Sequence, residues 1–214
     1  MRDGSQYIGL DLDGFAVDYI LGFRQKAAEL FPDRNVRIHG QAGQQTYIDP
    51  AVDDEMVRAV FDAENTPESW WLSLETLCTR ADRKALYRLD AHYDVYWVTE
   101  RPERAYTATY QWLAINNLPS YPIVILSDKV PWYEKMRGAA DDKVWPRLRV
   151  AVDDKPSIIQ RMTELGLPII VRDWPYNRAD IDPMVLRVSS VEEFCDVALT
   201  EPLMLPHQAP ALRH

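Results

Sequence analysis

Two carboxylates that directly follow a short apolar segment constrain this chain more than any other feature of its sequence. The apolar run at residues 7 to 10 leads into the tetrapeptide DLDG at residues 11 to 14. Such a run predicts a buried strand, in which Asp11 and Asp13 share one side. Carboxylates this close repel each other, and either a divalent metal or a shared proton can relieve the repulsion. The metal is the favoured explanation. A plain turn is the alternative, because Asp and Gly are common where strands end.

A second pair of carboxylates follows another apolar segment far along the chain. Asp153 and Asp154 come directly after the run RVAV at residues 149 to 152, and Pro156 then opens a predicted helix. In an open parallel sheet, the ligand crevice lies outside the carboxyl ends of the strands. Both acidic pairs are therefore expected to meet at one edge of such a sheet.

Two further apolar runs also end in polar residues. The run VYWV at residues 95 to 98 is followed by TERP, and the run IVIL at residues 123 to 126 is followed by SDK. Four strands would thus bring carboxylates, a hydroxyl and an ammonium group to the same edge. The pattern favours an α/β chain with a parallel central sheet flanked by helices.

About 75 residues between the first motif, which ends near residue 19, and the run VYWV interrupt this alternation. Insertions of that size usually have a function or form a subdomain. Helical patterns at residues 17 to 31, 51 to 63 and 68 to 89 surround a loop-like stretch at 37 to 50, which together indicate a small helical cap. The expected division is a core, a cap and a flexible, Pro-rich tail: residues 1–18 and 91–200, residues 19–90, and residues 201–214.

The adjacent tryptophans Trp70 and Trp71 stand out within the expected cap. One interpretation is a stacking wall for a nucleobase, since base–aromatic stacking is worth ~1–3 kcal/mol. The alternative, packing of the cap against the core, has at least equal weight for either ring.

The order of the motifs resembles that of the haloacid dehalogenase superfamily of phosphotransferases: D-x-D-G, a strand ending in Thr99, then Lys129, then the second acidic pair. Within the superfamily, DLDGFAVDY at residues 11 to 19, IVILSDK at 123 to 129 and VDDKP at 152 to 156 are similar to the 5'(3')-deoxyribonucleotidases. The resemblance implies a Rossmann-like core with a small helical cap inserted after the first strand. It also implies that cap aromatics lie against the base.

Phosphate ester hydrolysis needs a nucleophile, an acid–base group and positive charge around the phosphoryl oxygens. Asp11 is the expected nucleophile, which would form an aspartyl-phosphate, and Asp13 is the expected acid–base group. Thr99 is expected to donate its hydroxyl to a phosphoryl oxygen, and Lys129 to be the point charge that balances Asp11 and the phosphate. Mg²⁺ is the expected cofactor, because this hard cation prefers oxygen ligands. Its candidate ligands come from the two acidic pairs: Asp11, Asp13 through its carbonyl, and Asp153, while Asp154 is either a further ligand or a support for the ligands.

Three residues beside these motifs are further candidates for substrate binding. Phe15 stands where many similar proteins have Thr or Val. Glu100 brings a carboxylate close to the expected phosphate unless it points away. Arg101 either helps to hold the phosphate or forms a salt bridge on the rim. The resemblance also implies that backbone N–H groups near Phe15 and Arg101 surround the phosphate.

The lysine assignment has competitors. Lys129 lies further from the second acidic pair than the resemblance implies, so Lys135 and Lys143 are alternatives. Lys129 is preferred because it closely follows an apolar strand, whereas Lys135 lies in a helical pattern and Lys143 in a mixed polar run.

Charge and composition narrow the partners. With 24 basic and 33 acidic residues, the net charge of −9 argues against extended nucleic acid, because polyanion binding draws its affinity from Lys and Arg. No apolar run approaches the ~20 residues of a transmembrane helix, and the N-terminus lacks a signal peptide's apolar region. We expect a cytoplasmic protein with a small-molecule phosphomonoester substrate and no membrane partner. The sequence leaves a homodimer open.

Three functions stay open at this point. The first and preferred one is a magnesium-dependent 5'-nucleotidase that acts on nucleoside or deoxynucleoside monophosphates. The second is another phosphatase of the same superfamily, acting on a polynucleotide 3'-phosphate or a sugar phosphate. The third is a non-catalytic binding module with the same fold. The complete set of catalytic residue types argues against the third.

Overall fold

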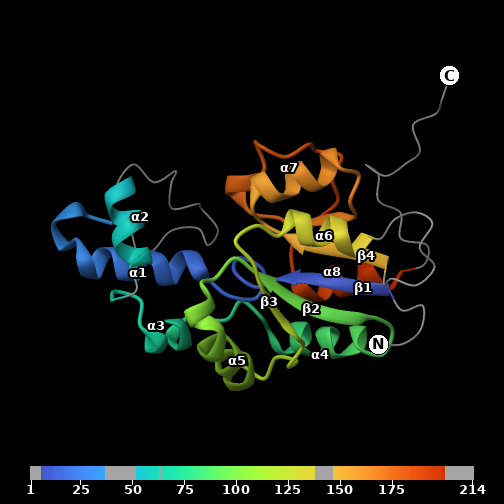
Figure 1. Cartoon of the computed structure of the whole chain (residues 1–214), viewed down its shortest axis with the longest axis horizontal. Coiled ribbons are helices and arrows are strands. Elements are labelled where there is room, and N and C mark those ends of the chain that lie inside the picture. Colours follow the sequence, from blue (N-terminus) through green and yellow to red (C-terminus); the bar gives the residue numbers. More distant parts are fainter. Residues whose placement is uncertain (1–5, 37–51, 63, 138–146, 201–214) are drawn as a thin grey trace.

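A six-stranded parallel sheet forms the centre of the computed structural model (Figure 1). The structure describes residues 6–36, 52–62, 64–137 and 147–200. The strand order is β3-β2-β1-β4-β5-β6, and all neighbours run parallel. The strands are β1 (Gln6–Asp11), β2 (Asp94–Thr99), β3 (Ile123–Ile125), β4 (Arg147–Asp153), β5 (Ile169–Arg172) and β6 (Arg187–Val188).

Strand β1 is a central strand, which is paired along both of its edges and covered on both of its faces. Tyr7 and Leu10, which point to opposite faces, are each fully buried, as is typical of strands in parallel sheets. On one side Asp11 pairs with Val98 of β2, and on the other Leu10 pairs with Val152 of β4. The end of β1 therefore lies between the ends of β2 and β4. The predicted α/β class with a parallel central sheet is confirmed.

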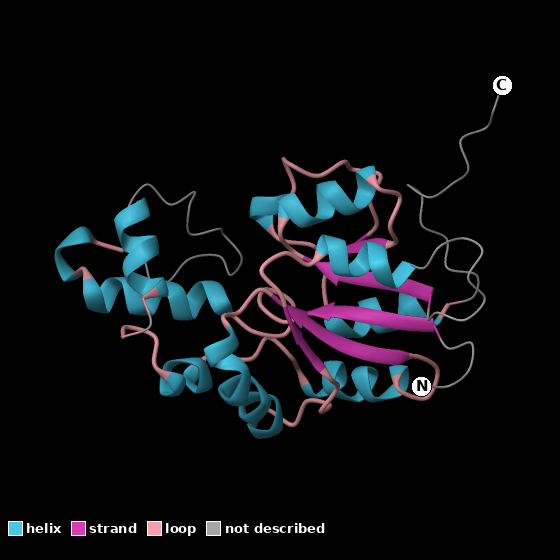
Figure 2. Cartoon of the chain, in the orientation of Figure 1, coloured by secondary structure: helices cyan, strands magenta, loops and turns pink. Residues whose placement is uncertain are grey.

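Helices cover both faces of the sheet (Figure 2). One face packs on α4, α5 and α8 through an apolar cluster that includes Leu86, Trp112 and Phe194. The other face packs on α6 and α7 through a cluster that includes Tyr133 and Ile159. The core is thus a three-layer α/β/α arrangement. Its helices are α4 (Arg80–Leu89), α5 (Tyr106–Ile115), α6 (Val130–Arg137), α7 (Pro156–Glu164) and α8 (Val191–Leu199).

Helices α1 and α2 lie to one side of the sheet, in the region expected to form a cap (left in Figure 1). They share an apolar cluster of their own, which includes Phe23, Met56 and Val60. Arg104 ties the end of α2 to the loop after β2, because its Nη2 donates to the Phe61 carbonyl oxygen at 3.1 Å. The helices of this region are α1 (Tyr19–Leu30), α2 (Asp54–Phe61) and α3 (Glu68–Ser73).

The helical pattern over residues 68 to 89 does not form one helix. Between α3 and α4 the chain pairs with the turn after β1: Val17 and Thr76 form an antiparallel bridge. Thr79 then begins α4 through a capping box with Asp82. Helix α4 packs on the sheet, and the predicted division into core and cap stays a prediction.

Three short 3₁₀ helices complete the described elements: η1 (Pro32–Arg34), η3 (Glu103–Ala105) and η4 (Pro175–Asn177). Within the described ranges, no helix is both long enough and apolar enough to cross a bilayer. The loop predicted at residues 37 to 50 and the tail predicted at residues 201 to 214 lie outside the described residues.

Candidate active site

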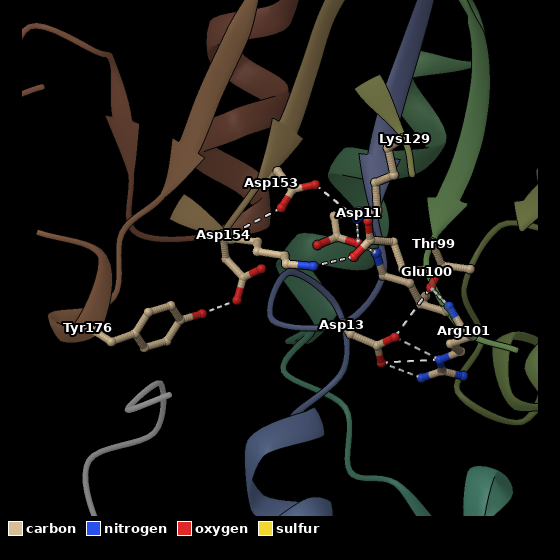
Figure 3. A network of polar contacts seen from close by, with 11 residues as sticks. Asp11, Asp13, Thr99, Glu100, Arg101, Lys129, Asp153, Asp154 and Tyr176 are labelled. Carbon is tan, nitrogen blue, oxygen red and sulfur yellow. Dashed lines mark hydrogen bonds and ion pairs between the residues drawn. The ribbon is translucent and has the colours of Figure 1, made fainter. Parts of the chain in front are cut away.

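The carboxyl ends of three neighbouring strands carry predicted catalytic and metal-binding residues (Figure 3). Asp11 is the last residue of β1, Thr99 of β2 and Asp153 of β4. Parallel strands end at the same edge of the sheet, so these side chains meet there. Lys129, which directly precedes α6, reaches the same point.

The turn after β1 brings the first and last motifs together. Gly14 has a φ of +84°, a conformation that favours glycine. A Cβ at this position would also collide with the Asp154 carboxylate. The glycine of the DLDG motif is therefore required both for the backbone turn and for the close approach of the second acidic pair.

Lys129 links the nucleophile candidate to the second acidic pair. Its Nζ lies 2.5 Å from Asp11 Oδ1 and 2.9 Å from Asp153 Oδ2, and all three residues are buried. Burial alone would lower the pKa of Lys129, but the charges of Asp11 and Asp153 outweigh it and hold that pKa well above its usual range. Lys129 is therefore charged at every physiological pH. Lys135 is exposed on α6, and Lys143 lies outside the described residues.

Three carboxylates gather around this lysine. Oxygen atoms of Asp11, Asp153 and Asp154 all lie within 4.8 Å of one another. Burial, and then the charge of Asp153, raises the pKa of Asp11 well above its usual range. The same two causes raise the pKa of Asp154 to about 7. A divalent cation would relieve the repulsion between these carboxylates, and their oxygens are the hard donors that it prefers. The cluster is therefore compatible with metal binding.

Asp13 faces Arg101 instead of this cluster (Figure 3). Arg101 Nη2 donates to Asp13 Oδ1 at 2.6 Å, and Arg101 Nε donates to Oδ2 at 2.9 Å. Thr99 Oγ1 also donates to Oδ2, at 3.3 Å. The sequence left two roles open for Arg101, and the structure shows a salt bridge. Its partner is the acid–base candidate Asp13, and only its arginine end is fully buried.

Glu100 pairs with a lysine across the site. Lys155 Nζ lies 2.6 Å from Glu100 Oε2, and both side chains are partly exposed. This pairing explains how a carboxylate is accommodated beside a site expected to bind phosphate. It joins the loop after β2 to the loop after β4.

A pocket of about 210 Å³ opens over these residues. One side of it is polar and includes Asp11, Asp13 and Lys129. Another part of its lining is apolar and comes from the region expected to form the cap. This apolar wall consists of four side chains: Tyr19, Ile20, Phe61 and Trp71.

Two predicted substrate contacts need correction. The Phe15 side chain is fully buried and packs edge-to-face on Phe194 in the core, so only its backbone remains near the site. Trp70 packs edge-to-face on Tyr19, and among the described residues Trp71 lines the pocket whereas Trp70 does not. Trp71 itself is 2% exposed and lies under Arg101, whose guanidinium carbon is 5.0 Å from the ring centroid.

Several pocket residues are absent from the sequence-based prediction. Phe61 and Tyr19 fall in helical patterns, in which an aromatic residue usually packs against the core. Lys155 directly follows the second acidic pair, and this position in the sequence indicates that it lies near the site. Tyr176 donates its hydroxyl to Asp154 Oδ2 from a segment 22 residues away, a pairing that only the folded chain reveals.

The raised pKa of Asp154 predicts that the metal-free protein becomes less stable as pH rises. The folded state keeps this proton up to about pH 7, whereas the ordinary value is 3.8. A raised folded-state pKa contributes stability that is full below pH 3.8 and is lost as pH rises through 7. In chelator we expect Tm to fall by several degrees between pH 5.5 and 8, since 1 kcal/mol corresponds to ~2–4 °C at this size.

Thermal denaturation of the native chain and of Asp154→Asn measures this effect, with Asp196→Asn at an exposed position of α8 as the matched control. Mg²⁺ should raise Tm more at pH 8 than at pH 5.5, because the proton and the metal compete for the same carboxylates. An unchanged pH dependence in Asp154→Asn would contradict the assignment.

No protein-family model matches the chain, and no curated protein matches it. Solved structures do match. A candidate hydrolase, YfnB from Bacillus subtilis, bound to magnesium, is 13% identical over 92% of this chain and 99% of that chain, with a TM-score of 0.55. A candidate phosphatase from Clostridium difficile is 15% identical over 92% and 100%, with a TM-score of 0.59. Protein Tyrosine Kinase A from Mycobacterium tuberculosis is 15% identical over 92% and 100%, with a TM-score of 0.62.

Further matching structures are described as haloacid dehalogenase-like hydrolases. The chain therefore has the fold of these hydrolases, in agreement with the superfamily that the order of its motifs resembles. What the matching structures share with the chain is this fold. The resemblance to the deoxyribonucleotidases stays a prediction.

Proposed function

We propose that the chain is a magnesium-dependent phosphomonoester hydrolase that acts on nucleoside or deoxynucleoside 5'-monophosphates through an aspartyl-phosphate. One observation carries the proposal: Asp11, Asp13 and Lys129 line a single pocket beside a carboxylate cluster that fits a metal ion. The candidate phosphatase with the same fold and the hydrolase bound to magnesium support it.

Asp11 is the nucleophile, and its surroundings select the attacking atom. Both the Leu12 N–H, at 2.7 Å, and Lys129 Nζ, at 2.5 Å, bind Oδ1. Oδ2 is therefore the oxygen that forms a bond to phosphorus while the bond to the leaving oxygen breaks. Lys129 balances the negative charge of Asp11 and of the transferring group, and such electrostatic stabilisation is a main contribution to phosphoryl transfer.

Asp13 moves the proton. It donates a proton to the leaving oxygen in the first step, and in the second step its carboxylate takes a proton from the water that attacks phosphorus. The second step releases inorganic phosphate and regenerates Asp11. Bound Mg²⁺, held by Asp11, Asp153 and Asp154, would supply positive charge for the phosphoryl oxygens.

The apolar wall supports a nucleotide as the substrate. Phe61 keeps 44% of its surface exposed although it lines the pocket. Its ring lies roughly parallel to that of Tyr19, with centroids 6.4 Å apart and an interplanar angle of 27°. An exposed ring opposite the phosphate site offers the face on which a base stacks. Trp71 is already covered by Arg101, so Phe61 replaces the tryptophan pair as the proposed stacking residue.

A phosphate-release screen tests the proposed activity. Nucleoside 5'-monophosphates, ribose 5-phosphate, glycerol 2-phosphate and a short DNA with a 3'-phosphate would each be incubated with Mg²⁺ or with EDTA. We expect magnesium-dependent release that is fastest for the monophosphates. Release from no substrate would contradict phosphatase activity, and preference for ribose 5-phosphate or the DNA would contradict only the nucleotide assignment.

The stacking role of Phe61 predicts a loss that depends on the base. Phe61→Ala should lower kcat/KM for a nucleoside 5'-monophosphate by ~5- to 150-fold, the equivalent of ~1–3 kcal/mol. Ribose 5-phosphate, which lacks the base, should be hydrolysed about as before. Phe61→Tyr should retain activity, and Tyr110→Ala at an exposed position of α5 is the distant aromatic control. Equal losses for both substrates would show that Phe61 only packs the cap.

A further inference from the structure

Arg101 is held on every side by groups that belong to three different elements. Its side chain is 1% exposed. Nε and Nη2 bind the Asp13 carboxylate, and Nη1 donates to Thr109 Oγ1 of α5 at 3.1 Å. The guanidinium carbon also lies over the Trp71 ring of α3, 5.0 Å from its centroid. The backbone N–H of Arg101 also donates to Thr99 Oγ1, at 3.2 Å.

This environment requires arginine. Only a planar guanidinium group can bind two carboxylate oxygens, a hydroxyl and an aromatic face at once, whereas the lysine ammonium is a compact charge on a flexible stem. A buried cation of this kind is stable because the carboxylate compensates it. The contacts fix Arg101 and thereby also fix the orientation of Asp13.

Asp13 nevertheless remains open to substrate. Its side chain keeps 21% of its surface exposed and lines the pocket. Arg101 and Thr99 make four contacts with its two oxygens, of which the one from Arg101 Nε to Oδ1 is a long second contact of 3.2 Å. The exposed part of the carboxylate is the part that a leaving group can reach from the pocket. The edge of the guanidinium that carries Nε and Nη2 points to Asp13, which makes Arg101 a partner of the acid–base group.

We propose that Arg101 is the positioning residue of the acid–base carboxylate, and that Thr109 and Trp71 hold Arg101 in place for this task. The proposal rests on the proposed phosphomonoester hydrolysis and deepens it. In the first step the bond from phosphorus to the leaving oxygen breaks as Asp11 Oδ2 bonds to phosphorus, and the Asp13 proton passes to that oxygen. In the second step Asp13 takes a proton from water. Arg101 keeps the carboxylate at the distance that both transfers need.

Leaving-group dependence distinguishes this role from a structural one. Phenyl phosphate and 4-nitrophenyl phosphate have similar shapes, but 4-nitrophenolate is a stable anion that departs with little help from an acid. Glycerol 2-phosphate releases an alkoxide, which needs the proton most. kcat/KM covers the steps up to departure of the leaving group. A misplaced acid should therefore lower kcat/KM most for glycerol 2-phosphate, less for phenyl phosphate and least for 4-nitrophenyl phosphate.

We expect Arg101→Lys to lower kcat/KM by about 10²-fold for glycerol 2-phosphate, within the range of general acid catalysis, and much less for 4-nitrophenyl phosphate. In contrast, kcat should fall for every substrate for which dephosphorylation of Asp11 is slow, because Asp13 also activates the water. Thr109→Val removes a single hydroxyl and should show the same order with smaller losses. Thr109→Ser, which keeps the hydroxyl, should restore activity.

The outcomes separate the two proposals. If the native chain releases no phosphate from any of the three esters, the proposed function fails. If the native chain is active and kcat/KM of a folded Arg101→Lys or Thr109→Val falls equally on all three, the positioning role is wrong. Turnover above the native level in either variant also overturns it, because the salt bridge would then inhibit Asp13. If Arg101→Lys does not fold, the comparison of kcat/KM between Thr109→Val and Thr109→Ser tests the positioning role.

Discussion

Asp11→Asn is expected to abolish phosphate release while the chain stays folded. The amide cannot form the aspartyl-phosphate, so the loss should be on the order of 10⁶-fold, as when the nucleophile of a serine protease is removed. Folding should survive because Asn removes one charge from a crowded cluster in which burial already raises the pKa of Asp11. In chelator, Tm should therefore be at least as high as that of the native chain.

Two measurements make this test specific. A substrate labelled on phosphorus should leave a covalent, hydroxylamine-sensitive label on the native chain after an acid quench, and no label on Asp11→Asn. Asp196→Asn, the same chemical change at an exposed position of α8, should behave as the native chain. If Asp11→Asn kept near-native turnover, Asp11 would not be the nucleophile and the aspartyl-phosphate mechanism would be wrong.

The strand ends of the site are predictable because each strand approaches the site as an apolar run. The runs before Asp11, Thr99 and Asp153 correspond to the last parts of β1, β2 and β4, which are largely buried. A polar residue at the end of such a run has to reach the edge of the sheet. This rule is enough to bring together residues that lie more than a hundred positions apart.

The partners of these residues are not predictable in the same way. Arg101 meets Asp13 across 88 positions, and Lys155 meets Glu100 across 55. Each pairing depends on how a loop turns after its strand, and no periodicity encodes that direction. Arg101 is therefore visible in the sequence as a candidate, but its orientation towards Asp13 and Thr109 follows only from the packed structure.

Helix geometry explains the outcome for the tryptophan pair. Consecutive residues of an α-helix point about 100° apart, so Trp70 and Trp71 of α3 cannot both face the pocket. Trp71 turns towards Arg101, and Trp70 turns towards Tyr19 of α1. The predicted helix over residues 68 to 89 fails for a different reason: the strand-like pairing of Thr76 with Val17 overrides local helical preference.

Lys129 closely follows an apolar strand, and this position favours it over the two other lysines as the phosphate lysine. Its removal is expected to have the second large effect. Lys129→Ala should lower turnover by at least ~10²- to 10³-fold, the loss expected when one preorganised electrostatic contact is removed. It leaves Asp11 and Asp153 buried without their cation. We therefore also expect a fall of several degrees in Tm in chelator, which Mg²⁺ partly reverses.

Lys135→Ala is the matched control, because Lys135 is exposed in the last turn of α6 and should change stability by no more than ~0.5 kcal/mol. Lys129→Met, which keeps the length of the stem without the charge, separates charge from packing and should be as inactive as Lys129→Ala. Lys143→Ala completes the series, and kcat/KM with Tm would be measured for all four variants. The ranking decides the assignment: a crippled Lys143→Ala beside an active Lys129→Ala would move the phosphate lysine to position 143. Lys129 would then serve only to neutralise two buried carboxylates.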